Sequence, residues 1–424
     1  MKQVSYWHDT APAFAQSRPV EHGTRADLIV IGAGFTGLSA ARTAARRGLH
    51  VQVFEAGHVV NEASGQNGGH CNNGLSHDFS GVASVVGIER AREMYRAFDA
   101  GVDLVEEIVN TENIDCHFRR SGKLKLAARP EHFDKMRRAQ EVLAREVDPD
   151  TAIVERGDLR TEIASDRYFG GLLQRRSAQM HMGKFGVGLA NAAARAGAII
   201  HEHAPVTAIE RKTGGFRVST AQGSVDTDEV LIATGASQTG PFSWFRRRIV
   251  PVGSFLIVTE PLGEEVARAL MPGHRNCTTT QNIGNYFRLT ADYRLVFGGR
   301  ARFAMSGQKS DLKSGGILQR QLKEVFPQVT GRRIDYCWGG LVDMTRDRLP
   351  RAGSLNGMHF ALGYSGHGVQ MSTYMGDVMA RLILRDDVSN PWRDMPWSAV
   401  PLHFGKPWFL PFVGAYYRIM DAIK

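Results

Sequence analysis

The sequence has few cysteines and no long apolar run. Its four cysteines stand far apart and form no C-x-x-C pair: Cys71, Cys116, Cys277 and Cys337. This distribution excludes a disulfide scaffold and a thiol-based zinc or redox motif. No stretch approaches the ~20 apolar residues that cross a bilayer, and residues 1–26 lack the apolar core of a signal peptide. We therefore expect a globular cytoplasmic protein without a transmembrane segment.

Acidic residues are outnumbered by basic ones, 43 to 52, so the chain of 424 residues carries a formal net charge of +9. The excess is scattered in short groups such as Arg46-Arg47 and the triplet at 246–248, without a basic tail. This pattern does not predict nucleic-acid binding and indicates a mild preference for anionic ligands. The 43% hydrophobic content excludes disorder. At ~150 residues per domain the length predicts two or three packing units.

A strand, a glycine-rich turn, a helix and a second strand follow one another near the N-terminus. Residues 27–31 (DLIVI) have strand length, and residues 32–37 have the sequence GAGFTG. The Ala-rich stretch 38–47 predicts a helix, and the strand predicted at 50–54 ends on Glu55. This order is typical of the β-α-β unit that binds a dinucleotide.

The residues of this unit have distinct expected roles. Gly32 permits a tight turn, Gly34 lets the backbone approach a pyrophosphate, and Gly37 lets the helix pack close to the strand. The helix N-terminus favours the negative phosphates. Glu55 is placed to accept hydrogen bonds from ribose hydroxyls and disfavours the 2′-phosphate of NADP. The other candidate contacts in this unit are Phe35, Thr36 and Ala56. The motif alone leaves NAD and FAD open.

Three further features favour FAD. The apolar strand at 228–235 ends in Ala-Thr-Gly, and the polar loop 63–69 (ASGQNGG) is flexible enough to run beside an isoalloxazine ring. A late strand at 358–362 precedes the turn 363–369 and a predicted helix at 370–384, whose N-terminus would stabilise negative charge on reduced flavin. The candidate contacts in these segments and nearby are Ser64, Gln66, Asn67, Gly68, Gly69, Val206, Ala233, Thr234, Gly235, Gly363, Ser365, Gly366, His367, Gly368 and Val369.

Five separated motifs carry a resemblance to a known family. They are Ser5-Tyr6-Trp7, ASGQNGG at 63–69, ASDRY at 164–168, YFRLTADYRLVFGG at 286–299 and GYSGHG at 363–368. Over essentially its whole length the chain resembles the D-amino-acid oxidase superfamily of FAD-dependent oxidoreductases and, within it, the gamma-glutamylputrescine oxidases. The resemblance implies non-covalently bound FAD.

The resemblance also implies an α/β fold, in which a Rossmann-like FAD-binding domain is interleaved with an α+β substrate domain that contains a large mixed or antiparallel sheet. We expect the FAD-binding domain at 26–80, 181–240 and 335–385, and the substrate domain at 81–180 and 241–334. A tail at 386–424 is rich in aromatic residues. It is expected either to pack over the protein's own groove or a partner subunit, or to lie on a membrane surface.

The sequence departs from the family pattern at three places. Gln66 stands where these enzymes usually have arginine. Sarcosine oxidases use a lysine beside the flavin to activate oxygen, whereas the corresponding strand 294–297 has none at the matching position. Some relatives attach the flavin through cysteine. Cys337 lies near the relevant strand, but we expect it to be a buried apolar residue beside Trp338.

The resemblance implies oxidation of a gamma-glutamylputrescine-like primary amine, with hydride transfer to flavin N5 and reoxidation by oxygen to give hydrogen peroxide. His367, Tyr364 and Arg288 are the catalytic candidates. His367 is expected near the ring or capping the next helix, and Tyr364 covering the substrate or packing against the flavin. Arg288 is expected to pair with a substrate carboxylate or to lie in a surface ion pair. Two alternatives stay open: an amino-acid or N-methyl-amino-acid dehydrogenase that uses an electron carrier, and a flavin-binding subunit of a larger complex. Homo-oligomers are compatible with the sequence, and no metal site is expected.

Overall fold

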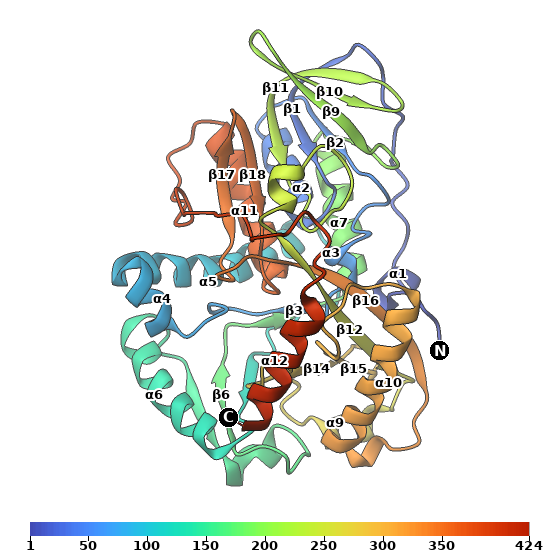
Figure 1. Ribbon diagram of the computed structural model, residues 1–424. Coiled ribbons are helices and arrows are strands. Elements are labelled where there is room, and N and C mark those ends of the chain that lie inside the picture. Colours follow the sequence, from blue (N-terminus) through green and yellow to red (C-terminus); the bar gives the residue numbers. More distant parts are fainter. Residues whose placement is uncertain (424) are drawn as a thin grey trace.

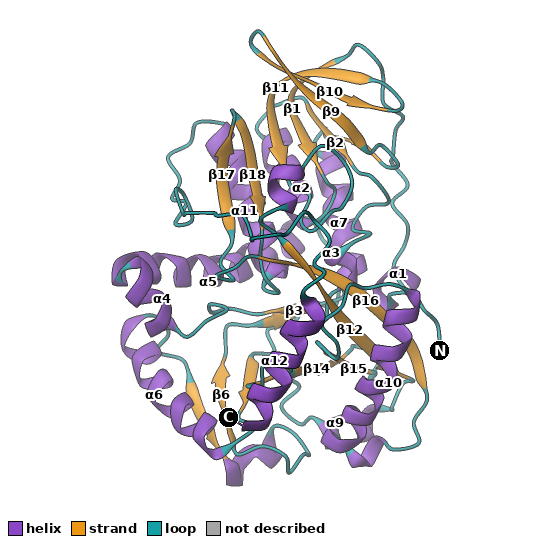
Figure 2. Ribbon diagram, viewed as in Figure 1, coloured by secondary structure: helices purple, strands orange, loops and turns teal. Residues whose placement is uncertain are grey.

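The computed structural model describes residues 1–423, and Lys424, the end of the predicted tail, lies outside the described residues. Two sheets organise the protein, one in the upper half and one in the lower half of Figures 1 and 2. The expected α/β architecture with a large mixed sheet is confirmed. Within residues 1–423, no helix is long and apolar enough to cross a membrane.

The first sheet has the strand order β17-β18-β11-β1-β2-β8, and the β9–β10 hairpin extends from β11. Its strands are β1 (Arg25–Ile31), β2 (Val51–Phe54), β8 (Ile199–His201), β9 (Val206–Lys212), β10 (Gly215–Thr220), β11 (Ser224–Ile232), β17 (Arg351–Leu355) and β18 (Met358–Leu362). The pairs β18–β11, β11–β1, β1–β2 and β2–β8 are parallel. All four central strands are therefore followed by loops at the same edge of the sheet.

Three helices pack together against this sheet: α2 (Phe35–Arg46), α7 (Met182–Arg195) and α11 (Gly368–Ile383). A β-carbon at Gly376 of α11 would lie 2.2 Å from the carbonyl oxygen of Thr36, so the close contact between α11 and α2 requires glycine. Helix α5 (Ile88–Thr111) packs against the far side of α11. The helical periodicity of the sequence runs over 81–111 without a break, but the structure divides this stretch into α4 (Phe79–Val86) and α5, because Gly87 between them has a φ of +86°.

The second sheet has the order β16-β12-β15-β14-β13-β4-β6-β5. Its strands are β4 (Lys123–Leu126), β5 (Ala152–Glu155), β6 (Gly170–Gln174), β12 (Val250–Thr259), β13 (Asn276–Thr279), β14 (Asn285–Leu289), β15 (Leu295–Gly299) and β16 (Ile334–Met344). Only the β13–β4 pair is parallel. Strand β16 lies within the segment 335–385 that we assigned to the FAD-binding domain, but it pairs with β12 in this sheet.

The two faces of the second sheet have different neighbours. Phe255, Phe287 and Phe297 pack under α10 (Gln308–Val325) and α9 (Glu264–Leu270) in one core. Leu256 and Trp338 alternate with such residues along their strands and join the core of the first sheet's helices. The remaining short elements are α1 (Tyr6–Asp9), α3 (Ala63–Gln66), β3 (His70–Cys71), α6 (Pro130–Glu146), η1 (Arg156–Thr161), β7 (Ala178–Gln179), α8 (Ser243–Arg246), η2 (Pro327–Val329) and α12 (Leu410–Ile423).

One side of the aromatic tail packs against the rest of the protein. Trp397 contacts the ring of Trp244 at a centroid distance of 5.5 Å, and Leu410 at the start of α12 is buried. Figure 1 shows α12 (red) crossing in front of the second sheet. Trp408, Phe412 and other side chains on the outer side of this segment are exposed.

Candidate active site

The glycine-containing turns that follow β1, β11 and β18 meet at one edge of the first sheet. These strands are neighbours and run parallel, so their carboxyl ends lie side by side. A β-carbon added to Gly32 would come within 2.7 Å of the carbonyl oxygen of Ala233. The Tyr364 hydroxyl lies 2.8 Å from Thr36 Oγ1. The structure therefore brings together the three segments that the sequence pattern assigned to a cofactor.

The loop that contains Ser64 packs against the N-terminus of α2. The Phe35 N–H donates to Ser64 Oγ at 3.1 Å, and a β-carbon at Gly34 would lie 2.9 Å from the same oxygen. A β-carbon at Gly37 would lie only 1.9 Å from the carbonyl oxygen of Gly32. Gly34 therefore lets Ser64 approach the turn, while Gly37 permits the tight strand-to-helix turn.

Glu55 lies at the end of β2 beside this turn. Its Oε2 accepts from the Ala33 N–H at 2.8 Å, and its Oε1 accepts from the Gly57 N–H at 2.8 Å. Burial raises the pKa of this carboxyl group, whereas the backbone donors lower it. Each oxygen retains a lone pair for a ribose hydroxyl, and the backbone of Ala56 also lowers the pKa of Glu55. Val206, which the sequence suggested as a cofactor contact, is buried at the start of β9.

Asp343 of β16 is a site residue that the sequence pattern did not reveal. Its carboxylate accepts from the Gly363 N–H at 2.6 Å, and it lies 4.0 Å from the position of a β-carbon at Gly235. Burial raises its pKa to about 6. The Ser365 N–H donates to its carbonyl oxygen, and Ser365 itself has a φ of +54°. Asp343 thus holds the turn before α11 against the second sheet.

The loop 66–69 is pressed against the second sheet by aromatic side chains. Trp338 Nε1 donates to the Gln66 carbonyl oxygen at 3.0 Å, and Trp7 Nε1 donates to the Asn67 carbonyl oxygen at 2.6 Å. A β-carbon at Gly68 would lie 2.6 Å from the ring of Tyr286. The loop therefore separates the first sheet's edge from Tyr286, and it needs glycine to fit there.

Arg288 lies directly behind the same loop. Its guanidinium donates to the carbonyl oxygens of Gly68 at 3.0 Å, Leu289 at 3.1 Å and Met180 at 2.8 Å. It also lies over the Trp7 ring at 5.0 Å. Burial lowers its pKa to about 9. Its donors are thus directed at protein carbonyl groups, and none of the ion pairs within residues 1–423 includes it.

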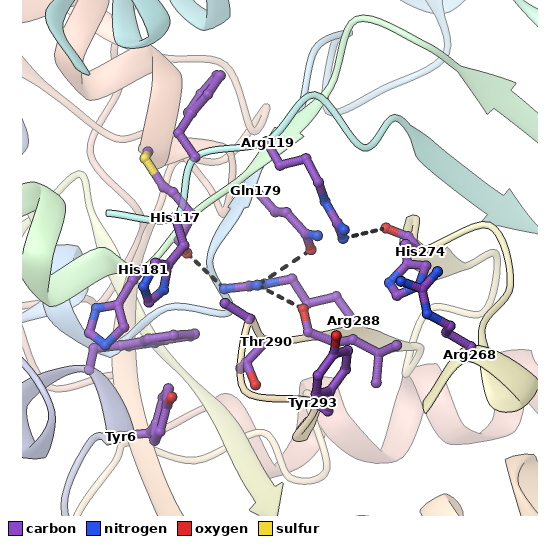
Figure 3. A pocket seen from close by; sticks show the side chains of 15 residues that line it. Tyr6, His117, Arg119, Gln179, His181, Arg268, His274, Arg288, Thr290 and Tyr293 are labelled. Atoms are coloured by element: carbon purple, nitrogen blue, oxygen red, sulfur yellow. Dashed lines mark hydrogen bonds between the residues drawn. The ribbon is translucent and has the colours of Figure 1, made fainter. Parts of the chain in front are cut away.

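A cavity of about 400 Å³ opens on the other side of Arg288 (Figure 3). Arg119, Arg268 and His274 line it, and its lining includes no carboxylate. His181 also lines it, and burial together with Arg288 lowers the His181 pKa to about 3. The cavity favours anions, and Arg288 separates it from Gly69 of the loop.

His367 immediately precedes α11, and its side chain makes no cap bond to the helix. Its Nδ1 is buried without a hydrogen-bond partner. Burial lowers its pKa to about 3, with Lys123 and Arg300 acting in the same direction. The imidazole is therefore neutral near pH 7 and retains hydrogen-bonding capacity. The turn places Gly366 and Gly368 beside it and Val369 in the first buried turn of α11.

Cys337 faces away from this site. It belongs to the core under α10, and its Sγ lies 3.4 Å from the Asp311 carbonyl oxygen. Burial raises its pKa to about 11. Trp338, the next residue on β16, points to the opposite face and contacts the loop.

These residues fit FAD. Glycine at 32 and 34 lets the turn before α2 pack closely against Ala233 and Ser64, and it places the N-terminus of α2 at the edge of the sheet, where a diphosphate would bind. Glu55 suits a ribose, and the turn ending at His367 directs a second helix N-terminus toward the same edge. The buried Nδ1 of His367 supplies an unused polar atom there.

Comparison with known proteins agrees with this geometry. The family described as FAD dependent oxidoreductase matches residues 27–382. The chain is 32% identical to "Probable oxidoreductase OrdL" of Haemophilus influenzae, covering 90% of this chain and 88% of that protein. It is 31% identical to gamma-glutamylputrescine oxidoreductase of Escherichia coli, covering 99% and 98%. The crystal structure of glycine oxidase from Geobacillus kaustophilus superposes with a TM-score of 0.69 at 20% identity, over 90% of this chain and 98% of that chain. The resemblance inferred from the sequence is confirmed: the chain belongs to the D-amino-acid oxidase family of FAD-dependent oxidoreductases and is a flavoenzyme that uses FAD.

Proposed function

We propose that this enzyme oxidises an unbranched primary amine whose far end carries a γ-glutamyl group, with oxygen as the electron acceptor. The observation that carries the proposal is the match to gamma-glutamylputrescine oxidoreductase, which extends over 99% of this chain. The glycine oxidase of Bacillus licheniformis is 27% identical and supports an amino-acid substrate as the alternative.

We propose that FAD binds along Gly32–Gly37, Glu55, the loop 64–69, Ala233–Gly235 and the turn 363–369. FAD supplies the acceptor for the hydride that leaves the amine carbon. The resulting imine is hydrolysed, so that amine, oxygen and water give aldehyde, ammonia and hydrogen peroxide. The protein's contribution is to bind the amine in its neutral form and to orient it.

The charges around the site favour the neutral amine. Lys123 is buried, and burial lowers its pKa to about 7. Lys123 also lowers the pKa of His367. Positive groups near a substrate ammonium disfavour its charged form, so they promote loss of the proton before oxidation.

The three catalytic candidates are proposed to act differently. His367, neutral and with a free Nδ1, hydrogen-bonds substrate or cofactor. Tyr364 holds the turn to α2 through Thr36. Arg288 provides a fixed positive charge behind Gly69, since its donors already bind protein carbonyl groups.

An amine panel under anaerobic conditions tests the proposal, with bleaching of the flavin as the measurement. We expect γ-glutamylputrescine to bleach it faster than putrescine, spermidine, sarcosine or glycine. Faster bleaching by sarcosine or glycine would support the dehydrogenase alternative and overturn the substrate proposal. A yellow protein that no amine bleaches and that elutes only with another polypeptide would support the subunit alternative. Peroxide formation in air tests oxygen as acceptor.

A further inference from the structure

Arg300, which directly follows β15, is partly buried and forms no ion pair within residues 1–423. Its only hydrogen bond among the described residues is a long contact from Nη2 to Met344 Sδ at 3.9 Å. By contrast, Arg294 pairs with Asp292 at 2.7 Å and Asp335 at 2.6 Å. Burial lowers the pKa of Arg300. A partly buried guanidinium without a protein carboxylate is available to bind the carboxylate of a ligand.

A second guanidinium reinforces the positive charge. Met344, which Arg300 contacts, and Tyr417, which Arg348 contacts, pack on the same small hydrophobic cluster, and the charge of Arg348 lowers the pKa of Arg300. Arg348 Nη2 reaches the Tyr417 hydroxyl at 3.4 Å, and no ion pair within residues 1–423 includes Arg348. Two neighbouring arginines repel each other, and a bound carboxylate would relieve this repulsion.

Helix α12 closes this region from the outside. Tyr417 stacks on Phe303 at a centroid distance of 5.4 Å, and a β-carbon at Gly414 would lie 2.9 Å from Phe303. Asp421 anchors the helix by accepting from the Asn282 N–H at 2.9 Å and the Ile283 N–H at 2.8 Å. The tail therefore has a defined position over the two arginines.

The arginine pair lies beside the proposed reaction site. Arg300 continues the alternation of Val296 and Gly298, which places it on the sheet face that carries Tyr286. Tyr286 contacts the loop at Gly68 and the ring of His70, at a centroid distance of 5.5 Å. The charge of Arg300 acts on both Tyr286 and His367. A substrate that extends from the loop 66–69 to Arg300 would thus place its neutral amine at the loop and an anionic group at Arg300.

We propose that Arg300 and Arg348, roofed by Tyr417, form a carboxylate subsite for the far end of the amine substrate. This inference rests on the proposed function and specifies what the enzyme recognises: a substrate that carries a carboxylate distant from the oxidised carbon. A diamine has a second cation at that position and is repelled.

Two substrates that differ only in this charge test the subsite: γ-glutamylputrescine and the same conjugate with its α-carboxylate converted to a carboxamide. We expect Arg300→Met to lower kcat/KM for the carboxylate substrate by about 10- to 100-fold, mainly through KM, and to change the carboxamide reaction less than about threefold. Arg300→Lys should restore part of the preference, and Arg348→Met should give a smaller loss in the same direction. Arg332→Met, an exposed cation on the surface, is the matched control and should change neither substrate. Equal losses for both substrates, or none, would overturn the proposal.

A binding measurement separates the subsite from the proposed function. Glutarate is titrated into the FAD-loaded wild type and the FAD-loaded Arg300→Met variant, and the flavin absorbance spectrum is followed. We expect saturable perturbation in the wild type and at least about tenfold weaker binding in the variant, whether or not γ-glutamylputrescine is oxidised. Failure of wild type to oxidise the conjugate, with glutarate binding intact, refutes the substrate proposal alone. Equal glutarate binding by both proteins, or none by the wild type, refutes the subsite.

Discussion

The guanidinium of Arg288 occupies the space that a side chain at Gly69 would need. A β-carbon on Gly69 would lie 2.0 Å from Arg288 Nη2, and Gly69 has a φ of +77°. Loop and arginine therefore fit together only because residue 69 is glycine. The contact thus joins the glycine-rich loop 63–69, which was predicted from the sequence, to the buried charge of Arg288 on β14.

Gly69→Ala should destabilise the protein by more than its backbone conformation explains. Gly48→Ala is the matched control: Gly48 has a φ of +90° and no atom within 4 Å of its missing side chain. The left-handed conformation alone should cost about 1–2 kcal/mol in the control. Denaturant unfolding of both variants measures the difference. Equal losses would show that Arg288 moves aside without cost.

FAD should be bound without a covalent bond. Cys337 lies on the α10 side of β16, away from the loop at Gln66. Acid precipitation should therefore leave the yellow colour in the supernatant. Colour in the pellet would contradict the prediction, and Cys337→Ser would then identify or exclude that residue as the attachment point.

His367→Ala should retain FAD and slow flavin reduction at saturating amine by about 10²-fold or more. The backbone N–H groups of the turn remain in the variant, but the unpartnered imidazole is lost. Because burial holds the His367 pKa at about 3, the residue stays neutral between pH 5 and 9. We therefore expect that the pH–rate profile of the wild type shows no inflection due to His367 in that range. The profile of His367→Ala should have the same shape. Anaerobic stopped-flow measurements test both statements, with the exposed His50→Ala as control. An unchanged rate would assign His367 a structural role.

Asp343→Asn should change how stability depends on pH. Burial raises the folded-state pKa of Asp343 to about 6 from its ordinary value of 3.8, so the native state binds the proton more tightly than the unfolded state. The stabilisation from this proton is complete below about pH 4 and is lost as pH rises through 6, a loss of about 3 kcal/mol. Between pH 4.5 and pH 7.5 the unfolding free energy of the wild type should therefore fall by more than that of the variant. Parallel pH profiles would show that the carboxyl group titrates normally.

Local sequence patterns predicted the elements that we propose hold the cofactor. The strand at 27–31, the helix after GAGFTG and the late strand at 358–362 occur within a few residues of their expected positions. Glycine spacing and strand-length apolar runs determine these turns through backbone geometry, so neighbouring residues suffice to indicate them. The break at Gly87 was missed because the helical periodicity continues across it, and only the backbone conformation reveals it.

The sequence by itself determined the β-α-β unit and its glycine turns, which depend on residues close together in the chain, and the family, which follows from short motifs that can each be read locally. The tertiary structure alone decided that Asp343 holds the turn at Gly363 and that Arg288 bonds to carbonyl groups behind the loop. It also left Arg300 without a carboxylate while giving Arg294 two. Whether an arginine is paired depends on strand register and on which distant segments pack over it, and charge spacing along a sequence contains neither.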